Sequence, residues 1–280
     1  MIPYLAIEYF SILGFKFYSW GFFIALAFLV GLALSIKVGR KVGISPEKII
    51  TLIVLVYFGA IIGARLFFVL QWPGEFLKDP VVIFNITQGG MMFYGGLFGG
   101  VLAGWLYIRK LENRWQLISR LNPIIALAMA IGRVGCLLNS DHLGGLTNVP
   151  WAMRMPDGFL RHPVALYLIL FDLALAGFLW WVLYSHSDPA SAGEESPTNV
   201  GNAVPHMWEI LRSAQDDKKT FLLFLTIYPL VRFLLDFTRD VSADPHFWGL
   251  ATSQWLSFGI FAVCLLYFLR LKSHKEAPVF

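Results

Sequence analysis

The sequence predicts an all-α, polytopic membrane protein: a single integral membrane domain, residues 1–280, with seven membrane-spanning helices. Of its 280 residues, 57% are hydrophobic and only 14% are charged, and the mean hydropathy is +0.65. In a soluble domain about one quarter of the residues are charged, so this composition excludes an ordinary water-soluble globule. Seven stretches are long and apolar enough to cross a bilayer, which takes about 20 residues. They are residues 17–37, 49–73, 81–108, 118–138, 163–185, 220–238 and 251–270.

Lys and Arg residues between these stretches predict the orientation of the chain. One set of loops is rich in them: Lys37, Arg40, Lys41, Lys48, Arg109, Lys110, Arg114, Arg120, Arg212, Lys218, Lys219, Arg270, Lys272 and Lys275. The opposite set holds little more than Lys16, Lys78, Arg154 and Arg161. Because cytoplasmic loops carry the excess of basic residues, we expect the N-terminus outside and the C-terminus in the cytoplasm. Residues 1–16 do not resemble a removable signal peptide, so the first stretch is expected to be retained.

Two loops are longer than the others. Residues 139–162 face outside in this topology and are rich in Gly and Pro, which predicts a small external cap. Residues 186–219 face inside and begin with a run rich in Ser, Gly, Glu and Pro, which is typical of a flexible linker. The two cysteines, Cys136 and Cys264, both lie in apolar stretches. Neither a disulfide framework nor a metal site is therefore predicted.

Four arginines lie where a membrane chain normally avoids charge. Arg65, Arg133 and Arg232 fall inside predicted spans, and Arg239 lies at the end of one. A basic side chain at the centre of a spanning helix costs about 2.5–3.5 kcal/mol on insertion scales. Each of these spans runs from inside to outside, with its arginine in the later half. We therefore expect all four arginines at the depth of the outer leaflet.

Acidic partners for these arginines are few. Asp236 follows Arg232 by one helical turn and is expected to pair with it, while Asp141 and Asp240 lie near the outer boundary. Three acids against four arginines predict a positive surplus, and arginine binds phosphate through a rigid, two-pronged fork. The hypothesis is a site for a phospholipid head group. The alternative, strongest for Arg65, is that these arginines only tie helices together or reach toward the interface.

The third stretch contains a glycine-rich run, GGMMFYGGLFGGVLAG, in residues 89–104. Several of its glycines are spaced four apart, which lets a neighbouring helix approach closely. Tyr94 lies within this run, where the glycines leave room beside its hydroxyl. The residue types suit a hydrogen-bond donor to a lipid phosphate or ester. A role as proton acceptor would require a phenol far more acidic than an ordinary tyrosine.

Four segments occur in a recognisable order: GGMMFYGGLFGG, GRVGCLLNSDHLGG, RHPVALYLIL and RFLLDFTRD. Together they resemble the prolipoprotein diacylglyceryl transferases, from about residue 15 to residue 270, with 186–219 as a poorly matching insertion. The resemblance implies an enzyme of the bacterial cytoplasmic membrane. It would move a diacylglyceryl group from phosphatidylglycerol to the lipobox cysteine of a prolipoprotein. Its partners would be these two substrates and membrane lipids, with no cofactor and no nucleic acid.

The resemblance also implies roles for individual residues. Arg133 and Arg239 match family arginines that hold the lipid head group, and with Tyr94 they form the expected catalytic set. Other positions match motifs that line the site or belong to the charged group described above. The expected substrate-binding residues are Arg133, Arg239, Arg65, Arg232, Asn139, Asp141, Gly144, Arg161 and His162.

The chain departs from the family pattern at several motif positions. Tyr94 stands where the family has histidine, Cys136 where it has asparagine, and Trp20 where it has tyrosine. Asp141 and Asp236 replace glutamates. If the family histidine is the general base, that role passes here to Tyr94 or to the phosphate of the substrate. The arginines are then expected to carry most of the catalysis, because they stabilise the charge that develops on the leaving phosphate.

Three other functions are consistent with parts of the sequence. The first is a divergent homologue that binds an anionic phospholipid but carries out different transfer chemistry or none. The second is a transporter or channel for an anion, which the missing internal repeat argues against. The third is a purely structural membrane protein, which would leave the arginine group without a function.

Overall fold

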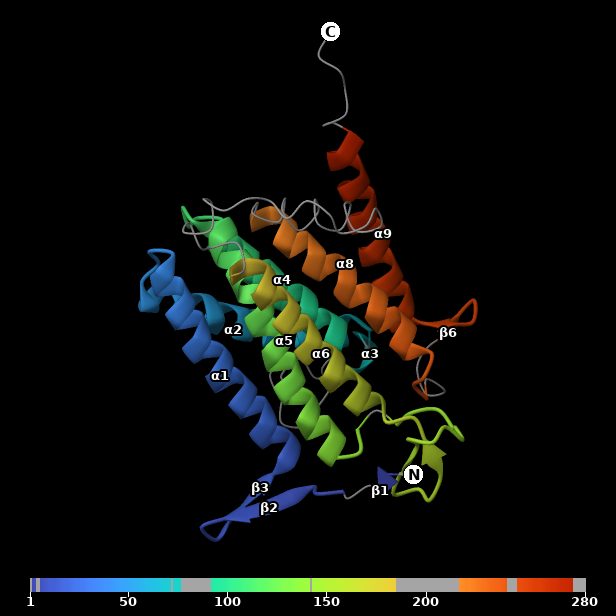
Figure 1. Ribbon diagram of the computed structural model, residues 1–280. Helices are drawn as coiled ribbons and strands as arrows, with labels where there is room; N and C mark the ends of the chain where they lie inside the picture. The colour runs from blue at the N-terminus through green and yellow to red at the C-terminus, as the bar shows by residue number, and fades with distance from the viewer. Residues whose placement is uncertain are drawn as a thin grey trace, which may run out of the picture. The chain divides into compact units, whose positions relative to one another are not determined.

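The computed structural model describes residues 2–3, 6–71, 73–76, 92–141, 143–184, 217–240 and 246–273. In this part of the chain, seven long helices coincide with the seven predicted stretches (Figure 1). They are α1 (Ser19–Lys41), α2 (Pro46–Gln71), α4 (Phe93–Ile108), α5 (Arg114–Leu138), α6 (Val164–Tyr184), α8 (Asp217–Asp236) and α9 (Thr252–Ser273). A single turn, α3 (Pro73–Phe76), follows α2. Residues 81–91 of the third stretch and 186–216 of the predicted cytoplasmic loop lie outside the described residues, and 217–219 begin α8.

The surface of these helices has membrane character. Four of them, α1, α2, α5 and α6, are long and apolar enough to cross a bilayer, and α4 and α9 contain shorter apolar segments. Large apolar side chains point outward along several helices: Leu70, Val101, Val263 and Leu266 are each more than 60% exposed. An apolar surface of this extent is unfavourable in water. The fold is therefore a mostly helical membrane protein, as the composition predicted.

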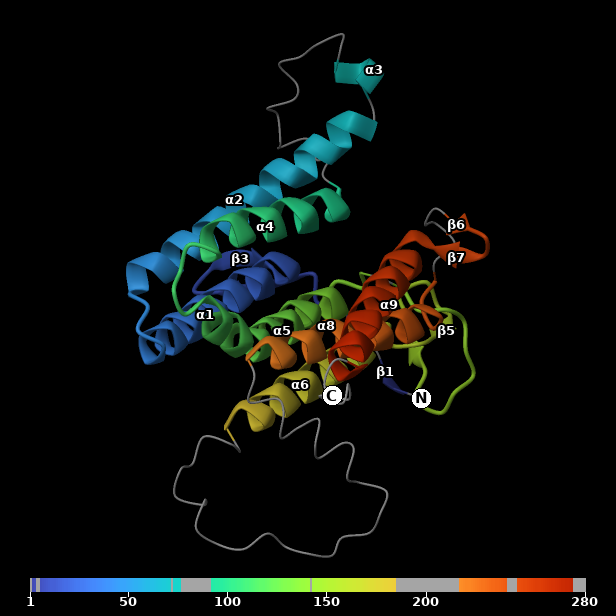
Figure 2. The same ribbon diagram turned by 90° about the horizontal axis from the view of Figure 1, so that it is seen from above.

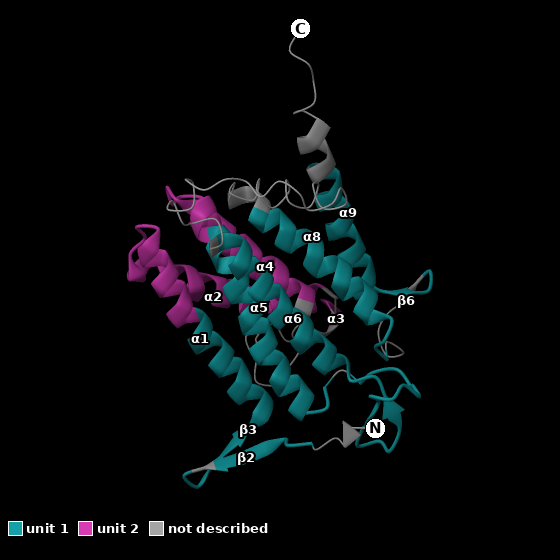
Figure 3. Ribbon diagram, in the orientation of Figure 1, with its two compact units in different colours: residues 1–31, 118–280 teal, residues 32–117 magenta. Residues whose placement is uncertain are grey.

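The chain forms two compact units, which are coloured separately in Figure 3. The first comprises residues 1–31 and 118–280, and the second comprises residues 32–117. Helix α1 contributes its first part to the first unit and its last part to the second. Each unit is described by itself below.

In the second unit, glycines bring α2 and α4 into direct backbone contact along their lengths (Figure 2). A Cβ atom on Gly63 would collide with the Gly95 carbonyl oxygen and lie 2.9 Å from Gly99 Cα. One on Gly59 would lie 2.6 Å from the Gly99 carbonyl oxygen. The prediction that the α4 glycines serve close helix packing is confirmed. Helix α2 supplies its own glycine pair, Gly59 and Gly63, to face them, and this pair was not predicted.

In the first unit, α5, α6 and α8 (green, yellow and orange in Figure 1) share one hydrophobic core. Its fully buried members come from α5 and α6, and side chains of α8 complete it. They are Ala126, Leu175, Ala176 and Leu179, surrounded by Leu127, Phe171, Phe178, Phe224, Ile227 and Tyr228. The small Ala126 and Ala176 let the helices come close, while Leu and Phe fill the remaining volume. This core fixes the three helices that carry the charged residues of the site.

Short strands accompany the helices, and the fold class remains all-α as predicted. Strands β2 (Tyr9–Ile12) and β3 (Phe15–Tyr18) form an antiparallel hairpin. Its two-residue turn has positive φ at both positions, 49° at Leu13 and 83° at Gly14, which matches the twist of the flanking strands. Three further pairings are two residues long: β1 (Ile2–Pro3) with β4 (Met153–Arg154), β4 with β5 (Leu160–Arg161), and β6 (His246–Phe247) with β7 (Leu250–Ala251).

Candidate anion-binding site

Arg133 lies on the face of α5 that packs into the core of the first unit. Ala126 and Ala130 precede it by seven and three residues, and both are buried, so the three residues share one side of the helix. On another side of the same turn, Gly135 lets α1 approach: a Cβ there would lie 3.0 Å from Trp20 Cα. Gly135 therefore lets α1 pack closely beside the turn of α5 that carries Arg133.

Helix α8 presents Tyr228, Arg232 and Asp236 along one ridge, since residues four apart lie above one another. Arg232 Nη2 lies 3.0 Å from Asp236 Oδ1, which confirms the predicted pair. It is an ion pair rather than a well-directed hydrogen bond, because Asp236 Oδ1 meets no hydrogen-bond geometry. The charge of Arg133 interacts with the Tyr228 hydroxyl and with the charge of Arg232. The arginines of α5 and α8 thus belong to one site.

Asp172 on α6 is a member of this site that the sequence analysis missed. Its side chain is completely buried, and its charge interacts with those of Arg133 and Arg232. A signal for it was present in the sequence. Leu168, Asp172, Leu175 and Leu179 recur at helical spacing on one face, so a carboxylate occupied a position that the apolar pattern assigned to the core. The earlier count of three acids near the arginines was therefore wrong.

Arg239 joins the group from the segment that follows α8. Its charge interacts with that of Arg232, and its backbone forms an antiparallel bridge with Gly144. Gly144 must be glycine, because a Cβ there would collide with the carbonyl oxygen of His162. The neighbouring Gly145 N–H donates to the Thr238 carbonyl at 2.9 Å. Three segments distant in sequence therefore converge through backbone contacts.

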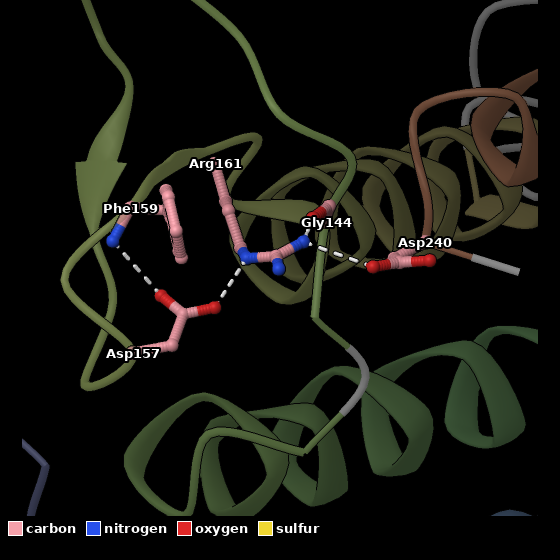
Figure 4. A network of polar contacts seen from close by, with 5 residues as sticks. All are labelled: Gly144, Asp157, Phe159, Arg161 and Asp240. Atoms are coloured by element: carbon pink, nitrogen blue, oxygen red, sulfur yellow. Dashed lines mark hydrogen bonds and ion pairs between the residues drawn. The ribbon is translucent and has the colours of Figure 1, made fainter. Parts of the chain in front are cut away.

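Arg161 links these segments through its side chain (Figure 4). Its Nε donates to Asp157 Oδ2 at 2.6 Å, and its Nη1 donates to the Gly144 carbonyl at 2.8 Å and to Asp240 Oδ2 at 3.0 Å. Burial opposes the charged form of Arg161, but these two carboxylates outweigh it and raise its pKa. The Phe159 backbone N–H, and after it the Arg161 guanidinium, hold the pKa of Asp157 below its usual value.

The remaining predicted residues of the first unit, Asn139, Asp141 and His162, lie in the segment that connects α5 to α6. Asn139 Nδ2 donates to Asp141 Oδ1 at 2.9 Å. His162 Nδ1 is 3.2 Å from the Tyr167 hydroxyl, which also accepts a hydrogen bond from the Trp151 indole N–H at 2.7 Å. Asn139 and Asp141 thus bind each other, and His162 is oriented by an aromatic pair.

Arg65 and Tyr94 belong to the second unit and are described only within it. Arg65 is buried, and its guanidinium carbon lies 5.6 Å from the centre of the Phe68 ring. Tyr94 begins the part of α4 that packs against α2, directly before Gly95, whose backbone meets Gly63. Both residues therefore lie at the closest approach of the α2–α4 pair.

The charged group of the first unit is suited to an anion. Arg133, Arg232 and Arg239 lie with two buried carboxylates, those of Asp172 and Asp236. Arg232 Nη1 is buried and donates to no acceptor within the described residues. A buried guanidinium N–H without an acceptor is costly, so an oxyanion bound here would be favoured. In the described ranges no cluster of His, Cys, Asp and Glu could hold a metal ion.

Comparison with known proteins shows the family to which the chain belongs. A sequence model of the family described as prolipoprotein diacylglyceryl transferase matches residues 8–198, more than half of the chain. The chain belongs to this family. The matched part includes Arg133, Gly144, Arg161, His162 and the carboxylate of Asp172.

Individual transferases of the family match over most of their length. A phosphatidylglycerol–prolipoprotein diacylglyceryl transferase of Bordetella bronchiseptica is 33% identical over 250 residues, covering 83% of this chain and 84% of its own. Its counterpart in Nitratidesulfovibrio vulgaris is 29% identical over 247 residues, covering 84% and 82%. A protein of Clostridium perfringens named as transferase 2 is 28% identical over 281 residues, covering 95% and 96%.

Proposed function

We propose that this protein transfers the diacylglyceryl group of phosphatidylglycerol to the lipobox cysteine thiol of a prolipoprotein. The products would be a thioether and glycerol phosphate, as in the first step of lipoprotein maturation. Membership of the family supports the reaction. The observation in the chain that carries it is the group of Arg133, Arg232 and Arg239, in which Arg232 has a buried N–H that meets no acceptor among the described residues.

We further propose seven spanning helices in the bacterial cytoplasmic membrane, with the N-terminus outside, the C-terminus in the cytoplasm and the site toward the outer leaflet. The distribution of Lys and Arg between the loops supports this orientation. Residues 139–162 would then form an external cap. Reporter fusions at Gly158 and Lys275 test it: a periplasm-active reporter is expected to work only at Gly158, and the reverse result would refute the orientation.

The reaction replaces a carbon–oxygen bond by a carbon–sulfur bond. The thiol loses its proton, the sulfur attacks the glycerol carbon, and the phosphate leaves with the bonding electron pair. The phosphate thereby changes from a diester with one negative charge to a monoester with up to two. Fixed guanidinium groups bind the more highly charged species more strongly, so they lower the barrier more than they stabilise the bound substrate. A positive site also favours the thiolate of a cysteine with a pKa near 8.5.

In this proposal Arg133, Arg232 and Arg239 hold the phosphate. Arg161 has both of its engaged nitrogens on protein acceptors, so we assign it to positioning: it holds the Gly144 carbonyl and the segment after Arg239. The segment that connects α5 to α6 would line the lipid head group on one side, through Asn139, Asp141, Gly144 and His162. From the second unit, Arg65 would add a further positive charge, and Tyr94 would donate its hydroxyl to the lipid or accept the thiol proton.

Arg133→Ala tests the proposal in purified protein with phosphatidylglycerol micelles and a lipobox peptide, read as the mass added to the peptide. We expect loss of transfer, and Arg133→Lys should recover little because a lysine lacks the planar fork. Arg120→Ala is the matched control: it removes an arginine from the same helix about 20 Å away along the axis, and should leave transfer near normal. Near-normal turnover of Arg133→Ala would refute the arginine mechanism.

Tyr94 decides between full transferase activity and a divergent function, because it replaces the family histidine. Tyr94→Phe is expected to reduce transfer less than Arg133→Ala does, if the hydroxyl only donates a hydrogen bond. Complete inactivation would instead assign it the proton transfer. A wild-type protein that binds phosphatidylglycerol but adds no mass to the peptide would favour the lipid-binding alternative.

A further inference from the structure

Two hairpins of the first unit contain the same unusual turn. Strands β2 and β3 are joined by Leu13 and Gly14, and strands β6 and β7 are joined by Trp248 and Gly249. Both residues of each turn have positive φ, 49° and 83° in the first turn and 51° and 81° in the second. Glycine adopts this conformation freely, whereas leucine and tryptophan rarely do, and asparagine or aspartate is the usual first residue. Both turns therefore keep a large apolar residue where the backbone does not favour one.

These two apolar side chains are almost fully exposed. Leu13 is 93% exposed and Trp248 is 94% exposed. The turn between β4 and β5, in the same unit, is also exposed, but it contains Pro156, Asp157 and Gly158, which are ordinary turn residues. A turn surrounded by water gains nothing from a leucine or a tryptophan. The contrast indicates that the β2–β3 and β6–β7 turns meet an apolar medium.

The β2–β3 hairpin is amphipathic along its whole length. Residues that pair directly across two strands point to the same face of the hairpin, and neighbours along a strand point to opposite faces. One face therefore carries Phe10, Phe15 and Phe17, and the other carries Tyr9, Ser11, Lys16 and Tyr18. Phe15 is 72% exposed, so its ring is available to the surroundings. Such a division of residues is typical of a segment at the boundary between lipid and water, where tyrosine is also enriched.

The phenylalanine face continues into a membrane-spanning helix. The ring of Phe10 lies 6.1 Å from that of Phe17 and 4.9 Å from that of Phe22 on α1, measured between ring centres. Helix α1 is long and apolar enough to cross a bilayer. Figure 1 shows the β2–β3 hairpin turned aside from the axis of α1, and the β6–β7 hairpin turned aside from the axis of α9. A hairpin that runs across the end of a spanning helix lies along the membrane surface.

Both hairpins are attached to segments that carry arginines of the site. At the base of the first hairpin, the Ile7 N–H donates to the Leu138 carbonyl at 3.0 Å, and the Ser19 hydroxyl donates to the Ile7 carbonyl. Leu138 ends α5, five residues after Arg133. The second hairpin begins seven residues after Arg239. Holding the two hairpins at a fixed depth would therefore also hold the ends of these segments.

We infer that the β2–β3 and β6–β7 hairpins are interfacial anchors: Leu13, Trp248 and the phenylalanine face insert among the lipids at the membrane surface, while Lys16 remains in water. The partner is the bilayer itself, at the boundary between head groups and acyl chains. The inference rests on the proposed membrane-spanning arrangement and not on the transfer reaction. Anchors at these two places set the depth of the α5 end and of the Arg239 segment, at the level where a lipid phosphate has to be met.

Spin labels on single cysteines test this in the full-length protein in phosphatidylcholine nanodiscs. Both native cysteines are replaced by alanine, and Phe15→Cys, Lys16→Cys, Trp248→Cys and Pro156→Cys are labelled one at a time. Oxygen, which concentrates in lipid, and a water-soluble nickel complex serve as relaxing agents. We expect oxygen to dominate at positions 15 and 248, and nickel to dominate at positions 16 and 156. Since Phe15 and Lys16 are neighbours on opposite faces, this pair controls for the label itself.

Three results would overturn the inference. A label at position 15 that nickel relaxes as strongly as the label at position 16 would place the first hairpin in water. Dominance of nickel at position 248 would do the same for the second hairpin. A label at position 15 that neither agent reaches would indicate a protein partner, such as a second copy of this chain or a lipobox peptide added to the sample.

Leu13→Asn separates the geometry of the turn from its anchoring. Asparagine accepts positive φ more readily than leucine, so the hairpin itself is kept. We expect the oxygen-to-nickel ratio of the label at position 15 to fall toward that at position 16. Leu13→Trp, which copies the other turn, should keep the original ratio. An unchanged ratio in Leu13→Asn would refute the role of Leu13. Transfer to the lipobox peptide is measured separately, so its absence would refute the proposed function and leave the anchors untouched.

Discussion

Gly63 offers a direct test of how α2 and α4 are held together. In Gly63→Ala, the new Cβ collides with the Gly95 carbonyl oxygen and lies 2.9 Å from Gly99 Cα, whereas ordinary contact begins near 3.4 Å. The helices must therefore separate by about 0.5 Å or more (3.4 − 2.9). Overpacking of this kind costs about 1–3 kcal/mol. The preference of a helix for Ala over Gly returns about 1 kcal/mol, so the net destabilisation should be about 0–2 kcal/mol.

Two other glycines provide matched controls for the same substitution. Gly177 on α6 has no atom within 4 Å of its Cβ position, so Gly177→Ala should leave stability unchanged or raise it by up to about 1 kcal/mol. Gly96 belongs to α4, but its Cβ would lie 3.3 Å from the Ala60 carbonyl oxygen, a tight but adjustable contact. Gly96→Ala should fall between the other two variants.

The assay is unfolding in mixed micelles with increasing SDS, followed by far-UV circular dichroism. Gly63→Ala and Gly177→Ala should differ by about 1–3 kcal/mol, or about 5- to 150-fold in the unfolding equilibrium constant. If Gly63→Ala proved as stable as Gly177→Ala, direct backbone contact would not be what stabilises the α2–α4 pair.

Further predictions concern the cap side of the site. Gly144→Ala places a methyl group against the His162 carbonyl and should separate the bridged segments, with transfer reduced at least tenfold in the peptide assay; normal activity would show that the bridge to Arg239 is dispensable. The pKa of Asp157 is lowered in the folded protein, so its charged form stabilises the segment around it. This stabilisation is complete above pH 3.8, the ordinary pKa of the carboxyl group, and is lost as the pH falls through the lower folded-state pKa. Amide exchange protection of Phe159, corrected for intrinsic rates, should therefore decrease in strong acid, and Asp157→Asn should abolish this dependence. A pH dependence that persists in the variant would assign it to another group.

A small number of charged side chains determines the electrostatics of the site. Arginines in a membrane helix are costly to insert, and the carboxylates of Asp172 and Asp236 offset part of that cost.

Local sequence patterns determined most of the fold. Long apolar stretches predicted all seven long helices, because in a bilayer a chain must satisfy its backbone hydrogen bonds within each segment. The spacing of Arg232 and Asp236 predicted their ion pair, because residues four apart on a helix are neighbours whatever surrounds them. The strands were not predicted, since those of the β1–β4–β5 group are two residues long and join distant segments.

The sequence by itself determined that this is a membrane protein of the transferase family with arginines in unusual positions. Tertiary structure alone decided which charges meet. The neighbours of Arg133 come from α6 and α8, about 40 and 100 residues away in the chain, and no helical period relates them. The same holds for Gly144, whose contacts with His162 and Arg239 depend on backbones from three segments converging. Periodicity acts within one element, whereas the potential at a site sums charges over all elements that pack around it, and only the packing supplies that sum.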